Sequence, residues 1–143
     1  MQDLKHIFRI IDANFNRSRE GLRVCEDIAR FALNSPRMSR ELKSVRHDIT
    51  GMMKVGVPGR GGLYVSRDSE GDVGRCSKMP SEMRRLCLDD IFIANAQRVK
   101  ESLRVLEELF KLIDKAASIK FAALRFKIYN IERRAVKKAL KVK

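Results

Sequence analysis

The stretch "NFNRSREGLRVCED", residues 14–27, decides the fold because a near copy of it, "NAQRVKESLRVLEE", returns at residues 95–108. When positions 13–27 and 94–108 are aligned without gaps, eight of the fifteen residues are identical. Chance rarely gives that many identities over so short a stretch. The chain therefore contains an internal repeat, and repeated helical units usually pack together to bury a shared core.

Apolar residues around the repeat recur at steps of three and four, which is the spacing of an amphipathic helix. The first stripe and its copy, 81 residues later, are Ile11, Phe15, Leu22, Cys25 and Ala29, then Phe92, Ala96, Leu103, Leu106 and Phe110. The second stripe and its copy, 79 residues later, are Met38, Leu42, Val45, Ile49 and Met52, then Ala117, Phe121, Leu124, Ile128 and Ile131. The sequence predicts two copies of a helical hairpin, at residues 3–54 and 82–138.

A single helical hairpin cannot bury its own apolar stripe, so the two hairpins should pack into an all-α four-helix bundle with pseudo-twofold symmetry. Ser35 is the expected N-cap of the second helix, with Pro36 at its first position. The length of 143 residues fits one domain.

The segment between the hairpins, residues 55–81, is predicted to be a long loop because residues 51–80 contain seven of the eight glycines. Loops longer than about 15 residues inside compact domains are usually functional or disordered. Within it, "LYV" reads as a short strand-like piece, and "GRGG" could present backbone N–H groups to an anion without completing a P-loop.

The formal net charge of +13 would attract nucleic acid, acidic membrane or phosphorylated small molecules. The basic tail, residues 133–143, holds six of the 31 lysines and arginines and is expected to be solvated. No apolar run approaches about 18 residues, and the opening residues lack the pattern of a targeting segment. We therefore expect a cytoplasmic protein with no membrane partner.

The cysteines and histidines do not form a metal-binding or disulfide pattern, because Cys25, Cys76 and Cys87 have no CxxC spacing and His6 and His47 do not pair with them. We interpret Cys25 and Cys87 as small buried apolar residues. Cys76 lies in the predicted loop and is not assigned.

A set of charged and amide side chains lies opposite the first apolar stripe and is repeated in the second copy. The set and its copy are Asn16, Glu20, Arg23 and Asp27, then Gln97, Glu101, Arg104 and Glu108. Two interpretations stay open: a solvent-facing ladder of weak helical pairs, or a polar seam that faces its symmetry copy across the bundle.

Asn14 and Arg17 differ from that set because helical geometry places them inside the apolar sector, with Gly21 one turn beyond. A guanidinium there must extend to solvent, pair with an acid, or face a cavity that holds an anion. A nearby ligand would also explain a glycine in the helix interior. Because Asn95, Arg98 and Ser102 repeat the trio, two arginines could line one central anion site; intramolecular ion pairs are the alternative.

Other candidates lie on the second helix of each hairpin and in the loop. Arg46 is repeated as Arg125, whereas the adjacent His47 is not repeated, and a lone histidine is more often structural. The loop group of Arg67, Asp68, Glu70 and Asp72 could supply carboxylate ligands to Mg²⁺, or could serve only solubility.

Five ordered motifs resemble the all-helical hydroxymethylpyrimidine phosphate kinase family of thiamine biosynthesis. They are "RIIDANFNRSREGLRVCEDIARF", "LKSVRH", "RDSEGDVG", "NAQRVKESLRVLEE" and "LRFKIYNIE", and they run from about Arg9 to Glu132. The resemblance implies transfer of the γ-phosphoryl group of ATP, with Mg²⁺, to 4-amino-2-methyl-5-hydroxymethylpyrimidine phosphate. Family members are often fused in front of thiamine phosphate synthase; no such barrel follows here, so a free-standing member is expected.

The repeated arginines and the family motifs together motivate the following assignments, which are a hypothesis. Arg17, Arg98 and Asp72 are expected to be catalytic. Phosphates are expected to contact Asn14, Arg46, His47, Arg67, Asn95 and Arg125, while Glu20, Arg23, Glu101 and Arg104 orient them. Asp68 and Asp72 are expected to hold Mg²⁺. A reaction of this kind relies on positioning and charge neutralisation, because the attacking phosphate oxygen is already an anion.

Two competing functions stay open beside the kinase. A basic helical domain could bind nucleic acid, although 6% aromatic residues and no tryptophan leave little for base stacking. The domain could also bind a phosphorylated ligand without turnover, in association with thiamine phosphate synthase. The expected partners are ATP and a phosphorylated pyrimidine; nucleic acid is disfavoured, and formation of a homo-oligomer stays open.

Overall fold

The computed structural model describes residues 2–57, 60–76 and 80–142. Its helices are α1 (Gln2–Phe31), α2 (Pro36–Gly56), α3 (Arg60–Ser66), the 3₁₀ turn η1 (Pro80–Met83), α4 (Leu88–Phe110) and α5 (Lys115–Val142). No strand occurs in the described ranges. The predicted all-α class is confirmed.

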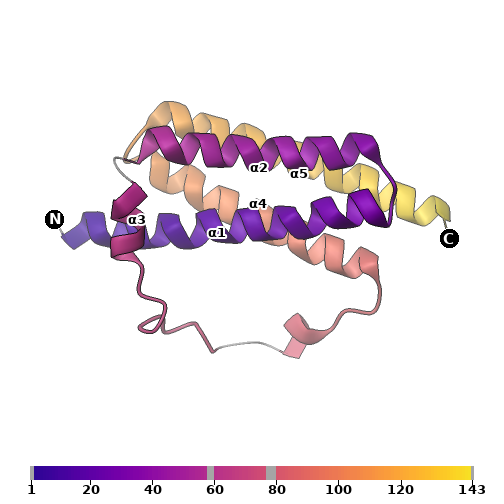
Figure 1. The fold of residues 1–143 in the computed structure, drawn as a ribbon, viewed down its shortest axis with the longest axis horizontal. Helices are drawn as coiled ribbons and strands as arrows, with labels where there is room; N and C mark the ends of the chain where they lie inside the picture. The colour runs from indigo at the N-terminus through magenta and orange to yellow at the C-terminus, as the bar shows by residue number, and fades with distance from the viewer. Residues whose placement is uncertain (1, 58–59, 77–79, 143) are drawn as a thin grey trace.

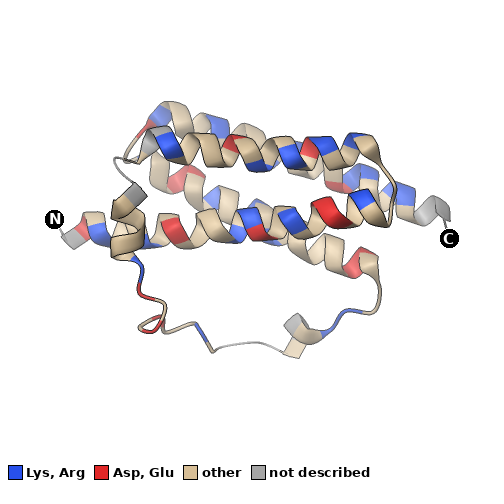
Figure 2. Cartoon of the chain, viewed as in Figure 1, with Lys and Arg blue, Asp and Glu red and all other residues tan. Residues whose placement is uncertain are grey.

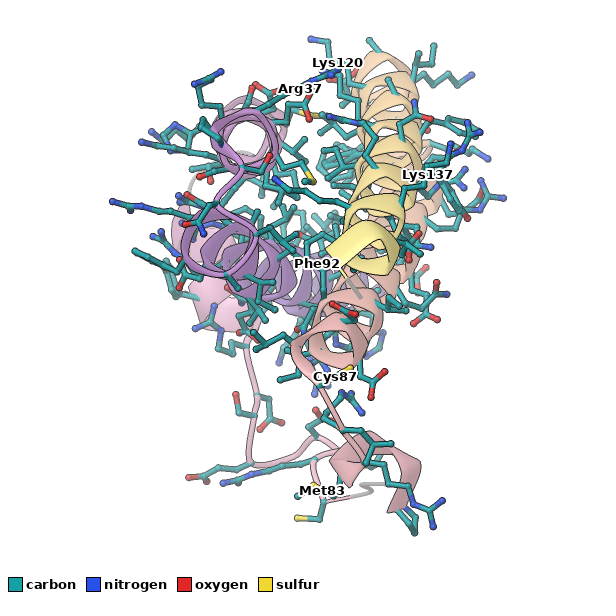
Figure 3. The ribbon with its side chains drawn as sticks, turned by 90° about the vertical axis from the view of Figure 1, so that its right-hand side faces the viewer. Arg37, Met83, Cys87, Phe92, Lys120 and Lys137 are labelled. Atoms are coloured by element: carbon teal, nitrogen blue, oxygen red, sulfur yellow. The ribbon has the colours of Figure 1, made fainter. Side chains whose placement is uncertain are left out.

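The four long helices form two layers, with α1 beside α4 and α2 beside α5 (Figures 1 and 3). The connection between the hairpins passes along the side of the α1/α4 layer that faces away from α2 and α5 (Figure 1). Within this connection the short helix α3 packs against α1. The connection is therefore held close to the helix that carries the first copy of the repeat.

The apolar stripes predicted from the sequence form the core between the two layers. Their residues are buried except Phe15 and Met52, which are half-buried against the core. Phe110 and Phe121 meet near the turn between α4 and α5, with their ring centroids 4.9 Å apart. The sequence-based prediction of the core is thus confirmed for both hairpins.

The turn between α1 and α2 uses the cap that the sequence predicts. The Ser35 side chain accepts a hydrogen bond from the Met38 amide at 3.3 Å, and Pro36 opens the helix. Asn34 adopts the left-handed conformation, with φ of 48°, which asparagine tolerates better than most residues. This tight turn brings α2 back alongside α1.

Two local predictions are wrong, namely the strand-like piece of the loop and the burial of Cys87. The "LYV" piece belongs to helix α3 rather than to a strand, so the predicted loop 55–81 is partly helical. The basic tail is the end of α5, which runs to Val142, and its residues Arg133 and Lys137 are exposed, as expected of a solvated tail. Cys87 is exposed at the start of α4, whereas Cys25 is buried as predicted.

Gly21 is explained by helix packing and not by a nearby ligand. A Cβ at this position would lie 2.8 Å from Cγ2 of Val99 and 3.0 Å from the backbone oxygen of Asn95, both on α4. Only glycine lets the two repeated helices approach this closely. The contact joins the first copy of the repeat, on α1, to the beginning of the second copy, on α4.

We expect Gly21→Ala to lower the free energy of unfolding by up to about 2 kcal/mol, because overpacking outweighs the better helix propensity of alanine. The matched control is Gly51→Ala, where an added Cβ has no neighbour within 4 Å; it should stabilise the protein by about 0.5 to 1 kcal/mol. Urea unfolding of both variants measures the difference. Equal stabilisation by both substitutions would contradict the close crossing of α1 and α4.

The buried Cys25 thiol should be unreactive while Cys76 and Cys87, both exposed, react. The Cys25 thiol donates a hydrogen bond to the Phe92 carbonyl at 3.6 Å, and burial raises the pKa of this thiol to about 12. An unfolded thiol has a pKa of 9.0, so this group's contribution to stability is complete below pH 9 and is lost as the pH rises toward 12.

A thiol reagent such as DTNB at neutral to mildly alkaline pH checks this expectation. Two of the three cysteines should react at once in the native protein, and the third only after denaturation. Rapid reaction of all three in the native protein would show that Cys25 is accessible.

Candidate functional site

The candidate site is a groove of about 670 Å³ on the side of α1 along which the connection passes. It brings together many of the predicted site residues from α1 and from the segment after α3. The lining residues are His6, Arg9, Ile10, Asp12, Ala13, Asn14, Asn16, Arg17, Glu20, Arg67, Asp68, Ser69 and Asp72. The groove is therefore rich in cations, amides and carboxylates.

A bidentate ion pair between Arg67 and Asp12 holds the connection against α1. Arg67 donates from Nε to Oδ2 of Asp12 and from Nη2 to Oδ1, each at 2.7 Å. Asp12 is buried, and the hydrogen bond from Arg67 to it raises the pKa of the guanidinium. The guanidinium also lies 4.9 Å from the centre of the Tyr64 ring on α3. Arg67 is thus fixed at the wall of the groove.

Asp12 is the residue of this pair that the sequence analysis missed. Its counterpart 81 residues later is Ile93, an exposed residue of α4. The search for repeated polar residues therefore passed over Asp12. The signal in the sequence is this difference between the two copies. An acid occurs at this position in one copy only, and the long connection also occurs only once. Asn16 supports Asp12, since its amide donates to the Asp12 backbone oxygen at 3.0 Å.

Asp68 and Asp72 lie on the same wall, where they shape the turns of the connection. Oδ1 of Asp68 accepts from the Gly71 amide at 2.8 Å, and Oδ1 of Asp72 accepts from the Gly74 amide at 2.9 Å. Arg9 of α1 donates to the Asp68 backbone oxygen at 3.4 Å. Across the described part of the chain, no group of three or more metal-ligating side chains is assembled.

Arg17 is exposed at the groove and has no ion-pair or hydrogen-bond partner among the described residues. The neighbouring Asn14 is buried, and its amide donates to the Ile10 backbone oxygen at 2.9 Å. Of the three options that the sequence left for Arg17, the structure shows an exposed side chain at the edge of a groove. This arginine is available to an anion.

The second copy of the trio is placed differently. The Asn95 amide donates to the Ile91 backbone oxygen at 2.8 Å, as Asn14 does in α1. Arg98 is exposed on α4 but is not among the residues that line the groove. A central site shared by Arg17 and Arg98 stays a prediction. The connection that closes the first half-site occurs once in the chain, so the two half-sites are not equivalent.

Arg46 and Arg125 each bind a glutamate of the neighbouring helix, in equivalent places. Arg46 lies 3.1 Å from Glu26, and Arg125 lies 3.2 Å from Glu107, where each distance joins a guanidinium nitrogen to a carboxylate oxygen. These pairs are largely buried and join α1 to α2 and α4 to α5. The two glutamates occupy equivalent positions of the repeat, although they were not among the predicted site residues. A role of the two arginines in phosphate binding stays a prediction.

Removing the carboxylate charge of Glu26 should destabilise the bundle, because Arg46 is left nearly buried without its counter-charge. We expect Glu26→Gln to lower the free energy of unfolding by about 1 to 3 kcal/mol. Glu101→Gln is the control, since Glu101 is exposed and accepts only from Gln97 of its own helix among described residues; its effect should stay within about 0.5 kcal/mol. Equal urea midpoints for both variants would show that the pair contributes little.

The remaining candidates are distributed over the surface of the bundle. Glu20 lines the groove, while Arg23 lies 3.9 Å from Glu26 and Arg104 lies 2.9 Å from both Glu107 and Glu108. Arg23 and Arg104 are exposed, as the solvent-facing interpretation of the polar set expects, whereas their partners Glu26 and Glu107 are largely buried. His47 is exposed on α2 and lines a different groove, with Lys120 and Lys127 of α5. It does not contribute to the groove on α1.

None of the described helices combines the length and the apolar character that crossing a membrane requires. No solved structure matches the chain.

Curated relatives share sequence over most of this chain. A protein of Nostoc punctiforme named Thiamine-phosphate synthase is 36% identical over 126 residues, which is 88% of this chain and 34% of the relative. Proteins of the same name from Rhodopirellula baltica and Synechocystis sp. are each 38% identical, over 86% and 88% of this chain and 32% and 35% of their own lengths. The chain thus spans about a third of these relatives.

A match to a protein family covers nearly all the elements described above. Residues 9–134 match the ThiD2 family, a range that begins in α1, includes Asp12, Arg17 and Arg67, and ends within α5. Both copies of the repeat and the connection between them lie inside it. The chain belongs to the ThiD2 family.

Proposed function

We propose that the protein is a kinase that transfers the γ-phosphoryl group of ATP to 4-amino-2-methyl-5-hydroxymethylpyrimidine phosphate, giving the diphosphate. The observation that carries this proposal is the ion pair of Asp12 with Arg67, because it fixes residues 67–72 against α1 and completes a groove around the unpaired Arg17. Guanidinium groups and carboxylates converge there from two separate segments of the chain.

The groove suits phosphoryl transfer because this chemistry needs positioning and charge neutralisation more than a dedicated base. The attacking oxygen of a phosphate monoester is already anionic near neutral pH. Arg17 would bind a phosphate in the fork geometry that guanidinium favours. Arg67 would present its remaining N–H groups from a fixed position, since Asp12 occupies the other two.

Asp68 and Asp72 fit Mg²⁺ in donor chemistry, since this ion is commonly held by one or two carboxylates with substrate phosphates and water completing its shell. Both residues line the groove together with Arg9 and Arg17 of α1. When bound, Mg²⁺ would supply charge neutralisation to the phosphates. The two carboxylates would hold it while Arg17 binds the transferred group.

The comparisons support the biosynthetic setting of this proposal. The relatives that share most of this chain carry the name Thiamine-phosphate synthase. The domain's own activity is proposed from the groove and from the sequence motifs, and not from that name.

Incubation of the purified protein with ATP, Mg²⁺ and the pyrimidine monophosphate tests the proposal. ADP and the pyrimidine diphosphate should appear in equal amounts, and chelation of Mg²⁺ with EDTA should abolish both. A thermal shift with ligand but no product would instead indicate a non-catalytic binding domain. Absence of both shift and product, in a folded sample, would reject the assignment.

A further inference from the structure

The net positive charge of the protein belongs almost entirely to one layer of the bundle. The sequences of α2 and α5 contain fourteen lysines and arginines and three acids, a net charge of +11. The sequences of α1 and α4 contain nine basic and ten acidic residues, a net charge of −1. Figure 2 marks the basic positions along both α2 and α5. The excess charge is therefore carried by the layer that lies away from the candidate site.

This layer contains a groove of about 580 Å³ between the start of α2 and the end of α5. Figure 3 shows the bundle with this end facing the viewer and labels Arg37 on α2 and Lys137 on α5. The lining residues are Arg37, Glu41, Ser44, Val45, Lys127, Asn130, Ile131, Arg133, Arg134 and Lys137. Five of these side chains are cations and one is a carboxylate, so the local charge is about +4.

One corner of the groove is already ordered by ion pairs. Glu41 of α2 binds Arg37 of its own helix and Arg134 of α5, one carboxylate oxygen to each. Both oxygens of the Glu41 carboxylate are therefore already paired with arginines. Arg134 is held in place across the groove, with 32% of its side chain exposed.

The other cations of the groove have no such partner. Within the described ranges, Lys127, Arg133 and Lys137 form no ion pair or hydrogen bond. Arg133 and Lys137 are four residues apart on one helix, a spacing at which like charges repel each other. An anion bound between them would relieve this repulsion and would gain charge-assisted hydrogen bonds.

We infer that the groove between α2 and α5 is a second anion site, for a small molecule that carries two or more linked phosphate groups. The size of the groove fits a small ligand, and a linked polyphosphate can meet several cations at once. Extended nucleic acid is disfavoured, because no aromatic side chain lines the groove in the described part of the chain. This inference goes beyond the proposed kinase, since the groove shares no residue with the site on α1.

Isothermal titration calorimetry with sodium tripolyphosphate, without Mg²⁺ and at physiological salt, tests the inference. The double variant Arg133→Gln/Lys137→Gln should bind at least about tenfold more weakly than the wild type. The matched control Arg40→Gln/Lys43→Gln removes the same charge from exposed positions of α2 that do not line the groove; its affinity should change less than about threefold. Thermal melts check that both variants are folded.

A third variant, Arg17→Ala, distinguishes binding in the groove between α2 and α5 from binding in the groove on α1. It should retain the tripolyphosphate binding that the Arg133→Gln/Lys137→Gln variant loses, whether or not the kinase reaction is found. Equal weakening by both double variants would overturn the inference in favour of diffuse attraction to the whole layer. Tripolyphosphate binding that depends on Arg17 alone would also overturn the inference. So would tighter binding of a 16-base-pair DNA duplex than of tripolyphosphate, if both double variants weaken the binding of the duplex equally.

Discussion

Arg17→Ala is expected to reduce kcat/KM for the pyrimidine phosphate by at least about 100-fold, with the fold intact. Arg17 is the exposed cation of the α1 groove that has no partner among the described residues. Its removal therefore breaks no ion pair or hydrogen bond among the described residues, and the substitution should act mainly on the bound phosphates. A loss of this size is typical when a donor that stabilises transition-state charge is removed.

Steady-state kinetics of Arg17→Ala should be measured beside Arg30→Ala, which removes the same charge from an exposed position of α1 outside the groove. Within the described ranges, Arg30 interacts with the neighbouring Phe31 ring and forms no ion pair or side-chain hydrogen bond, so the control should retain most of the wild-type activity. Similar losses in both variants would mean that general electrostatic attraction, and not a site at Arg17, supports turnover. Full activity of Arg17→Ala would show that the groove is not the catalytic site.

Asp12→Asn is expected to reduce turnover by about 100-fold although Asp12 itself need not touch substrate. An amide offers one acceptor oxygen and no charge, so it cannot bind both nitrogens of Arg67 as the carboxylate does. Residues 67–72 would then lose the ion pair to α1 and keep only weaker contacts such as the hydrogen bond from Arg9 to the Asp68 backbone oxygen, and small displacements of catalytic groups are costly. The free energy of unfolding should change by only about 1 kcal/mol, because Arg67 is partly exposed.

Asp27→Asn is the matched control for Asp12→Asn, since Asp27 is an exposed acid on the same helix outside the groove. It should leave both kcat and KM close to the wild type. Arg67→Gln should reproduce the loss in Asp12→Asn, and the double variant should lose little more than either single one. Additive losses would contradict the view that the two residues act as one unit.

The fold could be predicted from the sequence because its main signal is repeated. Helical spacing of the apolar residues, two offsets near 80 and one capping serine were enough to identify the hairpins and their buried faces. The connection was predicted less well. Its strand-like "LYV" is helical because α3 packs on α1, and this tertiary contact outweighs the β-propensity of three residues.

The candidate site was predictable in two parts. Asn14 and Arg17 stood out because helical geometry places them in the apolar sector and because Asn95 and Arg98 repeat them, while the charged loop motif indicated Arg67, Asp68 and Asp72, which also line the groove. Asp12 occurs in one copy, and its role depends on Arg67, 55 residues away, which no local pattern reveals. Gly21 is a different case, because the sequence shows an unusual glycine in a helix without showing why it is needed. The reason is the close approach of Val99 and Asn95 from another helix.

The central claim is that the protein moves the γ-phosphoryl group of ATP to the pyrimidine phosphate, and tracing that group tests it most directly. ATP labelled with ¹⁸O in the γ-phosphoryl group is incubated with the wild-type protein, Mg²⁺ and the pyrimidine monophosphate, and the products are resolved by mass spectrometry. The proposal predicts that the label appears in the terminal phosphate of the pyrimidine diphosphate, in equal amount to ADP. Label found only in inorganic phosphate, or left in ATP, would contradict it.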